Sequence, residues 1–429
     1  YTPFILNVGA HATTYTYNFG QDSSFAGTKT AQGNQDENDK GDFYYEPPSG
    51  FLALCTDNLS DPSIADPTAH FNTVLWSGVD AANSITGVGF QPDLLWFKAR
   101  NNSSNHRFQD VIRGATSALY SNNAAAEGTN NTNLNSFDTD GFSMNQSPQS
   151  GGMGNYASDT YVGWNWKAGG APTADNSAGA GATPTAGSVK IDGSNLGSAL
   201  AGNIAATRLS ANTTSGFSIV KYTGTGISGD NIAHGLSEAP TLVITKGMDE
   251  SGSWQVGSNF LQSGAWTNYL TLETNSAVGS AIQAWNNTAP SSTIVTLGTG
   301  ASANESGDDF VAYCFHNIEG YSKVGSYEGN NNVDGAFVYC GFKVSMVLIK
   351  NIDSAGNDWL IFDDKRDTYN LVNQTLFPNA SDDEATASTG YDFVSNGFKA
   401  RSTAANKNQA YTYLYYAVAE SPFKYSNAR

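Results

Sequence analysis

One ordered series of landmarks recurs three times along the chain, and it constrains the fold more strongly than any other feature. Each series opens with an alternating, strand-like stretch that ends in glycine. It continues through a strongly apolar run that ends in lysine, and it closes with an aromatic strand. The opening stretches are 71–78, 217–224 and 321–329, and the closing strands are 161–166, 310–315 and 413–418. The sequence therefore predicts three copies of one supersecondary unit.

The apolar runs and the turns between them predict β-structure throughout. The runs Leu94–Phe97, Leu242–Thr245 and Met346–Ile349 are typical of strands that are buried on both faces. Asp-Gly within 137–142 and Asn-Gly within 393–398 are strong hairpin signals. Charged residues make up only 14% of the chain, which disfavours long surface helices. We therefore expect an all-β chain of tandem antiparallel β-sandwich repeats, of the jelly-roll or concanavalin-like kind, each of roughly 100 residues.

Domain boundaries follow from the repeats and from the composition between them. We expect repeat 1 at 69–168, repeat 2 at 216–320 and repeat 3 at 321–429. Residues 169–215 are rich in Gly, Ala, Ser and Thr, and they predict a flexible or extended linker. Repeats 2 and 3 follow each other almost directly and should pack rigidly. Residues 1–68 do not match the repeat, although 1–8 and 14–20 alternate like strands.

The charge balance narrows the choice of partners. Lys and Arg number 21 against 39 Asp and Glu, which gives a net charge of -18. A field of that sign repels phosphate backbones and anionic bilayers, so nucleic acid is not an expected partner. No apolar run approaches the roughly 18 residues that a membrane span requires, so membrane insertion is not expected either.

The sequence contains no recognisable catalytic motif. It has no HExxH pattern and no G-x-S-x-G elbow, and its cysteines form no CxxC pair. The neighbours Asp308 and Asp309 should point to opposite faces of a strand, as should Asp363 and Asp364. Glycoside hydrolysis needs two carboxyl groups about 5–9.5 Å apart across a cleft. We therefore expect no catalytic residues and no cofactor, and a protein that is not an enzyme.

Four aspartates are the candidate metal ligands. Asp138 and Asp140 lie in one polar loop, and Asp353 and Asp358 bound another. Neither loop has the full twelve-residue calcium pattern with its terminal Glu. Both loops lie where the repeats place hairpins, which favours a role as turn residues, with structural calcium as the alternative.

Two tryptophans are the candidate glycan contacts. Trp266 and Trp285 lie in polar, Asn-rich stretches, unlike the aromatic residues of the closing strands, which we expect in the core. An indole pairs a large apolar face with a polar N–H and is therefore suited to contact at a wet surface. The sequence thus favours these two rings as exposed contacts, with stacking on sugars as an alternative to packing.

Two further features concern the strands themselves. Lys98, Lys246 and Lys350 end the apolar runs, and we expect them to reach solvent and to discourage edge pairing. The opening strand of the third copy is one residue longer than the others and contains Gly325. This extra glycine predicts a β-bulge.

Parts of the chain resemble proteins of marine bacteriophages. The strand Asn18–Gly20, followed by 43–55, is similar to the end of a SPRY-like, concanavalin-type sandwich in those proteins. The stretches similar to the repeat module that follows that sandwich are 85–93, 111–116, 161–164, 306–315 and 421–429. The resemblance implies that residues 1–68 are the C-terminal part of a SPRY-like β domain plus a connector.

The resemblance also implies a function, because such proteins are mostly known as tail-fibre or virion proteins. We therefore expect a non-enzymatic structural protein at the virion surface or another extracellular place, a tail fibre or a tail-associated receptor-binding protein. Tandem sandwiches would form a long spacer, and analogy with tail fibres favours a homo-oligomer, specifically a homotrimer. The expected partners are other virion proteins and a host surface glycan or protein. The alternatives are a capsid decoration protein, another surface-filament protein, and a polysaccharide depolymerase.

Overall fold

The computed structural model describes residues 16–128, 133–145, 154–262 and 265–427. It divides into two compact units, Tyr1–Asp61 and Pro62–Arg429. The strand predicted at 1–8 lies outside the described residues. None of the helices within the described ranges is long and apolar enough to cross a bilayer.

Residues 16–61 of the first unit contain little regular structure. Their one helical turn is η1 (Thr56–Asn58), and the backbone of Asn34 pairs with that of Phe43 in an isolated bridge. The unit is organised by polar side chains instead, since Asp36 accepts hydrogen bonds from the backbone of Ala53 and from the Asn58 amide, both at 2.7 Å. The described part of the predicted strand 14–20 is not a strand. The β-domain remnant expected over 1–68 therefore has no β-strand within 16–61.

The second unit is built from antiparallel sheets, which confirms the all-β, sandwich-type prediction. Repeat 1 begins after the turn η2 (Pro67–Ala69). Its inner sheet has the order β1-β8-β3-β4-β5, and its outer sheet has the order β2-β7-β6. The strands are β1 (Phe71–Ser77), β2 (Asn83–Thr86), β3 (Leu94–Ala99), β4 (Arg107–Asp110), β5 (Leu119–Tyr120), β6 (Leu134–Asp138), β7 (Gly141–Met144) and β8 (Thr160–Trp166).

Repeat 2 has the same inner order, β12-β19-β14-β15-β16, and a smaller outer pair, β13-β18. Its strands are β12 (Phe217–Thr223), β13 (Asn231–Ala233), β14 (Leu242–Gly247), β15 (Gln255–Ser258), β16 (Asn268–Thr271), β17 (Gly279–Ser280), β18 (Ile294–Thr296) and β19 (Asp309–Phe315). Three short helical segments are added, namely η3 (Ala265–Thr267), α1 (Ile282–Trp285) and α2 (Ala301–Asn304). These α-helices have no counterpart in the described parts of the other repeats.

Repeat 3 follows the same plan, with the inner order β20-β27-β22-β23 and the outer order β21-β26-β25-β24. Its elements are β20 (Ser322–Glu328), β21 (Phe337–Tyr339), β22 (Phe342–Asn351), β23 (Leu360–Asp363), β24 (Val372–Thr375), β25 (Ala385–Val394), β26 (Gly397–Arg401), β27 (Thr412–Pro422) and η4 (Phe423–Tyr425). The registers also agree. Trp166 faces both Phe71 and Leu94, Phe315 faces both Phe217 and Leu242, and Val418 faces both Ser322 and Met346.

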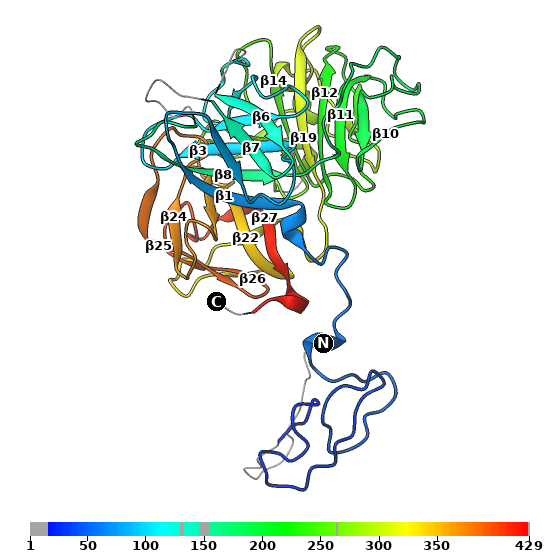
Figure 1. Cartoon of the computed structure of the whole chain (residues 1–429), viewed down its shortest axis with the longest axis vertical. Coiled ribbons are helices and arrows are strands. Elements are labelled where there is room, and N and C mark those ends of the chain that lie inside the picture. Colours follow the sequence, from blue (N-terminus) through cyan, green and yellow to red (C-terminus); the bar gives the residue numbers. More distant parts are fainter. Residues whose placement is uncertain (1–15, 129–132, 146–153, 263–264, 428–429) are drawn as a thin grey trace. The chain divides into compact units, whose positions relative to one another are not determined.

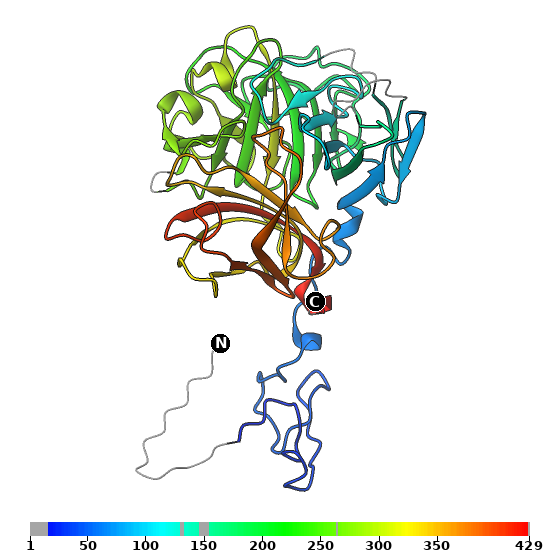
Figure 2. The same cartoon turned by 90° about the vertical axis from the view of Figure 1, so that its left-hand side faces the viewer.

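The three inner sheets share one hydrophobic core. Each inner sheet turns one face to this core and packs its other face on the outer strands of its own repeat. The shared core contains Trp96 and Trp164 of repeat 1, Trp254 of repeat 2 and Trp359 of repeat 3. Figures 1 and 2 show the three repeats side by side around this centre. The sandwiches are therefore not strung out in a row, and the expected long spacer is wrong for residues 62–429.

Backbone hydrogen bonds join the repeats in a closed ring, each repeat bonding the next in the same way. Glu127 N donates to Met248 O (2.8 Å), Val278 N donates to Ile352 O (2.9 Å), and Glu384 N donates to Arg100 O (2.7 Å). The unit therefore has approximate threefold symmetry within a single chain.

Residues 169–215 form sheet rather than a flexible linker, so that prediction is wrong. This stretch contains β9 (Val189–Ile191), β10 (Ser194–Asn195) and β11 (Ala206–Asn212). Strand β11 pairs with β12, so that β9, β10 and β11 add three strands to one edge of the inner sheet of repeat 2, while β17 extends its opposite edge. At the start of the stretch, buried Asp93 accepts the backbone N–H groups of Ala168 (2.7 Å) and Gly170 (3.1 Å). Small residues such as glycine allow tight turns and close contact between backbone segments. They are also typical of flexible linkers, so composition alone does not distinguish the two cases.

The lysines at the strand ends are buried, which corrects their expected exposure. Lys98, Lys246 and Lys350 each have a relative exposure of 0%. Each ammonium group donates to backbone carbonyls instead, for example from Lys98 to Ala99 O (2.6 Å) and to Asn102 O (2.8 Å). Burial lowers the pKa of each of these lysines to about 8. The lysine is therefore an internal clasp of each repeat rather than a guard of an exposed edge.

Two of the three repeat interfaces contain a buried ion pair. Asp110 pairs with Arg113 at 2.7 Å, and Asp363 pairs with Arg366 at 2.6 Å. Each carboxylate also accepts a hydrogen bond from the next repeat around the ring, from Tyr313 Oη (2.8 Å) and Trp164 Nε1 (3.1 Å) respectively. The register places Ser258 and Leu261 at the matching positions of repeat 2. Repeat 2 thus shows that a serine and a leucine can occupy the positions of the aspartate and the arginine.

We predict that breaking one ion pair destabilises the unit more than replacing both partners. Arg366→Leu leaves the buried Asp363 carboxylate without its cation, which should lower the free energy of unfolding by about 3–5 kcal/mol. The double variant Asp363→Ser/Arg366→Leu copies repeat 2 and should recover much of that loss. Guanidinium denaturation of the three proteins measures this, and equal losses in both variants would contradict it.

We also predict that stability rises between pH 8 and 9. A lysine pKa near 8 in the folded state, against 10.5 in the unfolded chain, means that the unfolded chain binds more protons in this range. The free energy of unfolding therefore increases with pH, by at most about 1.4 kcal/mol per pH unit for each lysine. Above pH 9 the buried thiols of Cys314 and Cys340, with pKa values raised to about 12, act in the opposite direction. Urea denaturation should give a smaller slope for Lys98→Met, and an unchanged slope would refute the prediction.

Candidate functional site

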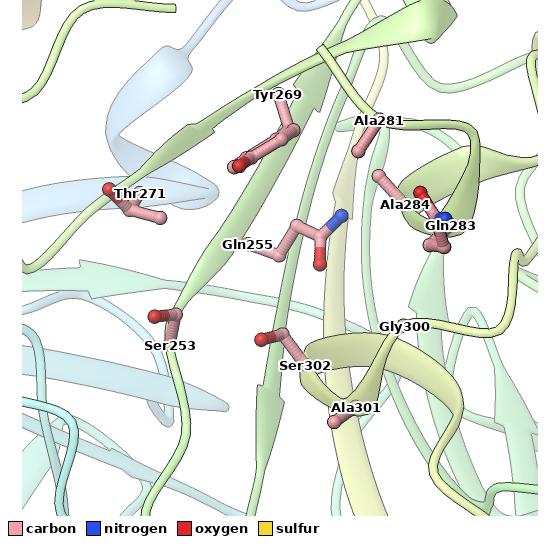
Figure 3. A pocket seen from close by; sticks show the side chains of 10 residues that line it. All are labelled: Ser253, Gln255, Tyr269, Thr271, Ala281, Gln283, Ala284, Gly300, Ala301 and Ser302. Carbon is pink, nitrogen blue, oxygen red and sulfur yellow. The ribbon is translucent and has the colours of Figure 1, made fainter. Parts of the chain in front are cut away.

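A small polar pocket in repeat 2 is the candidate site. It has a volume of about 230 Å³ and lies between strands β15 and β16 on one side and helices α1 and α2 on the other. Its walls are Ser253, Gln255, Tyr269, Thr271, Ala281, Gln283, Ala284, Gly300, Ala301 and Ser302. Figure 3 shows the Gln255 amide in the middle of the space bounded by Tyr269, Ala281, Gln283 and Ser302.

The alternation of side chains along the strands creates one wall of the pocket. Trp254, just before β15, and Val256 within it point into the shared core, and Gln255 between them points outward. In β16, Leu270 is in the core, while Tyr269 and Thr271 face the pocket. The opposite wall comes from the two short helices, whose ends are linked by the bond from Gly300 N to Gln283 O (2.8 Å).

The Gln255 amide faces the open pocket, and it is not among the fully buried polar atoms that lack a partner. The residue is 6% exposed, and among the described residues its amide makes no hydrogen bond. The side-chain polar groups of Ser253, Tyr269, Gln283 and Ser302 likewise have no partner in the described part of the chain. The pocket therefore presents several free donors and acceptors to whatever enters it.

The two tryptophans that were candidate glycan contacts are buried on the same face of β15 as Gln255. Trp266 is 5% exposed and Trp285 is 0% exposed, so the expectation of exposed rings is wrong. The rings meet edge to face at 5.3 Å, and both pack on Gly257, where a Cβ would lie 2.5 Å from Trp266 and 2.6 Å from Trp285. Polar flanking residues suggested exposure, whereas a glycine on the facing strand makes the room that buries both rings.

The residue at the position of Gln255 differs in each repeat. The register places Arg107 of repeat 1 and Leu360 of repeat 3 at the position of Gln255. Arg107 is buried with its guanidinium 5.5 Å from the ring centroid of Tyr120, and Leu360 belongs to the core of its own sandwich. Sequence analysis missed Gln255 because it treated the repeats as equivalent. A comparison of the residues at equivalent positions of the three repeats could have identified Gln255.

The chemistry of the pocket is that of neutral hydrogen bonding. The lining consists of amide and hydroxyl groups, small residues and one aromatic ring. That ring belongs to Tyr269, the one ionisable side chain among the lining residues. General acid–base catalysis requires a positioned carboxylate, imidazole or comparable group. The lining therefore suits the recognition of a hydroxyl-rich neutral molecule and offers no carboxylate pair for hydrolysis.

The four candidate calcium ligands act as turn residues. Asp138 accepts hydrogen bonds from Ser136 (2.7 Å) and Ser143 (2.5 Å), and Asp140 accepts from Gly89 N (2.6 Å). Asp353 accepts from Thr412 N (2.7 Å), and Asp358 accepts from Asn379 Nδ2 (2.8 Å). No cluster of three or more His, Cys, Asp or Glu side chains that could hold a metal occurs within the residues that the structure describes.

Comparison with known proteins gives one family. The model of a domain of unknown function, DUF7483, matches residues 66–195 and again 190–422. No curated protein and no solved structure matches the chain significantly.

We predict that the tryptophan pair is structural and that Gln255 is not. Trp285→Ala removes a fully buried indole and should lower the free energy of unfolding by about 3–5 kcal/mol. Gln255→Ala removes an unpaired amide and should change it by less than about 1 kcal/mol. Chemical denaturation distinguishes the two, and a Trp285→Ala variant as stable as the parent would contradict the assigned role.

Proposed function

We propose that this chain, which belongs to the DUF7483 family, is a non-enzymatic virion structural protein that binds a host surface glycan. In this proposal it is a phage tail fibre or a tail-associated receptor-binding protein, located at the virion surface. The Gln255 pocket takes one neutral sugar unit of that glycan. The observation that carries the binding role is the Gln255 amide, which makes no hydrogen bond within the described residues and faces the pocket among other free hydroxyl and amide groups.

The size and chemistry of the pocket favour a sugar. Its volume of about 230 Å³ is below the roughly 300–1,000 Å³ of sites for drug-sized ligands. Amide and hydroxyl groups can each donate and accept, which matches the hydroxyls of a hexose. The Tyr269 ring adds an apolar face for the C–H side of the sugar. One such contact is weak, with Kd near 1 mM corresponding to about -4 kcal/mol, so useful affinity comes from several copies on one particle.

The architecture supports a binding head rather than a spacer. Three sandwiches around one core form a rigid block, on which loops and short helices can vary without loss of the fold. The net charge of -18 favours solubility and repulsion between crowded copies. Placement on a phage particle rests on the resemblance of 43–55 and of the repeat stretches to marine phage proteins. The proposed partners are other virion proteins and further copies of this chain, with a homotrimer by analogy.

The alternatives have less support. A capsid decoration or surface-filament protein would share the fold but would not require the unpaired polar pocket. A polysaccharide depolymerase requires two free carboxyl groups, yet Asp363 is paired with Arg366, and Asp364 accepts a bond from Ser345 Oγ (3.0 Å). Asp309 is paired with Lys221 at 2.9 Å. The paired carboxylates marked in the sequence are thus largely engaged in structural contacts.

We predict that Gln255→Leu abolishes the binding of neutral sugars without loss of stability. Leucine is the residue that repeat 3 has at this position, so the variant should fold. Saturation-transfer NMR with glucose, galactose, mannose and N-acetylglucosamine should detect at least one ligand, and Gln255→Leu should weaken it by about tenfold or more. Gln283→Ala should weaken the same ligand.

Ile282→Ala is the matched control, because Ile282 lies beside Gln283 in α1 but is 53% exposed and does not line the pocket. Binding should be unchanged in this variant. If none of the four sugars binds, or if Gln255→Leu binds as the parent does, the pocket is not the receptor site.

A further inference from the structure

A second cleft, in repeat 3, has a different chemistry. It has a volume of about 300 Å³ and lies between strands β20 and β21, and Phe260 of repeat 2 forms part of its wall. The other lining residues are Asn317, Lys323, Val324, Gly325, Ser326, Tyr327, Phe337, Val338, Tyr339 and Tyr415. Unlike the Gln255 pocket, this cleft combines exposed aromatic rings with a cation.

Tyr415 provides a free hydroxyl at the floor of the cleft. The side chain is 3% exposed, and its Oη makes no hydrogen bond with any described residue. The ring is held edge to face against Phe398 at 5.3 Å. Burial keeps the pKa of Tyr415 well above its usual value, so the phenol remains a hydrogen-bond donor at neutral pH.

An exchange of small and large residues opens this cleft in repeat 3 alone. In repeat 1, Val74 of the first inner strand lies opposite Gly163, and in repeat 2, Val220 of β12 lies opposite Ala312. Repeat 3 instead has Gly325 opposite Tyr415. A Cβ on Gly325 would lie 2.6 Å from Tyr415 Oη. The register is regular here, so Gly325 does not mark the predicted bulge but makes room for the phenol.

The walls of the cleft are two half-exposed aromatic rings. Phe337 is 50% exposed and Tyr339 is 54% exposed, whereas Val338 between them is buried in the core of the sandwich. Large aromatic side chains are costly to leave in water, and two of them beside one cleft form a platform for an apolar ligand face.

Lys323 supplies the cation at the rim. Its Nζ donates to the carbonyl of Tyr339 (2.7 Å) and lies 5.4 Å from the centroid of that ring. These contacts fix the ammonium group beside the platform. No carboxylate pairs with Lys323 among the described residues, although the chain has 39 acidic side chains. Two of its three donors are therefore free to bind an anion.

We propose that this cleft binds a carboxylate-bearing sugar unit of the uronic-acid type. The ring of the sugar stacks on Phe337 and Tyr339, its carboxylate pairs with Lys323, and a hydroxyl bonds Tyr415 Oη. The inference rests on the proposed function in that both sites take host polysaccharide. A site for a neutral sugar and a site for an acidic sugar in one rigid protein unit would bind two residues of a mixed polysaccharide. Binding at both sites would increase the avidity.

The test is saturation-transfer NMR with sodium D-glucuronate and D-glucose, titrated into the parent and into Gln255→Leu. The Gln255→Leu background removes the first pocket, so glucuronate binding there reports on the repeat 3 cleft alone. Glucuronate should bind with a Kd in the millimolar range and about tenfold more tightly than glucose in this background. Lys323→Met should abolish that preference, and 0.5 M NaCl should weaken glucuronate binding in the parent but not in Lys323→Met.

Two variants separate the cleft from the fold. Tyr415→Phe removes only the hydroxyl and should weaken glucuronate binding about threefold to tenfold. Gly325→Val/Tyr415→Ala copies the residues of repeat 2 and should bind no glucuronate, while the loss of the buried ring should lower its thermal midpoint.

Equal binding of glucose and glucuronate in Gln255→Leu, unchanged binding in Lys323→Met, or binding of a proline-rich peptide in place of glucuronate would each overturn the assignment. If neutral sugars fail to bind the parent but glucuronate behaves as expected, the Gln255 pocket fails and the acidic-sugar site stands. The converse result leaves the proposed function intact and refutes this site.

Discussion

The shared core is the interaction on which the rest of the second unit depends. An inner sheet with Trp96 and Trp164 on its inward face would expose both indoles if its repeat stood alone, and the same holds for Trp254 and Trp359 in the other repeats. At about 25 cal/mol per Å² of apolar surface, each such side chain contributes several kcal/mol when its neighbours cover it. When the three inner sheets close into a ring, each covers the apolar inward faces of the other two. The tandem order of the sequence therefore becomes a compact block rather than a rod.

The closed ring explains why so many polar groups are buried. Once the sheets meet, the strand ends and hairpins at their borders have no access to water, so their polar groups must be hydrogen-bonded internally. The lysine clasps, the Asp110–Arg113 and Asp363–Arg366 pairs and the ring of backbone bonds serve this purpose. Repeat 2 shows with Ser258 and Leu261 that the ion pair is not essential at every interface. Its presence at two interfaces and not at the third distinguishes the three contacts, which is consistent with a role in fixing which repeat meets which.

Sequence reasoning predicted the local elements well and their association poorly. Alternation, apolar runs and Asp-Gly or Asn-Gly turns depend on neighbours along the chain, so the main strands of each repeat and their recurrence could be predicted. Whether Lys98 is exposed depends on what packs over the end of its strand, and whether 169–215 is flexible depends on the free edge of β12. These are contacts between distant segments. The same reason accounts for the burial of Trp266 and Trp285, which no local pattern indicates.

The repeats are most informative where they differ. A duplicated unit keeps the residues that its fold requires, as with the lysine clasp, and can change those that it does not require. Gln255 stands where the other copies have Arg107 and Leu360, and Gly325 with Tyr415 stands where they have valine opposite a smaller residue. Both changes leave the backbone register intact, and both open a cavity with an unpaired polar group. An exchange that sacrifices packing in one copy, while two others show a filled alternative, is not explained by stability. It is the pattern expected where binding, rather than folding, determines the residue.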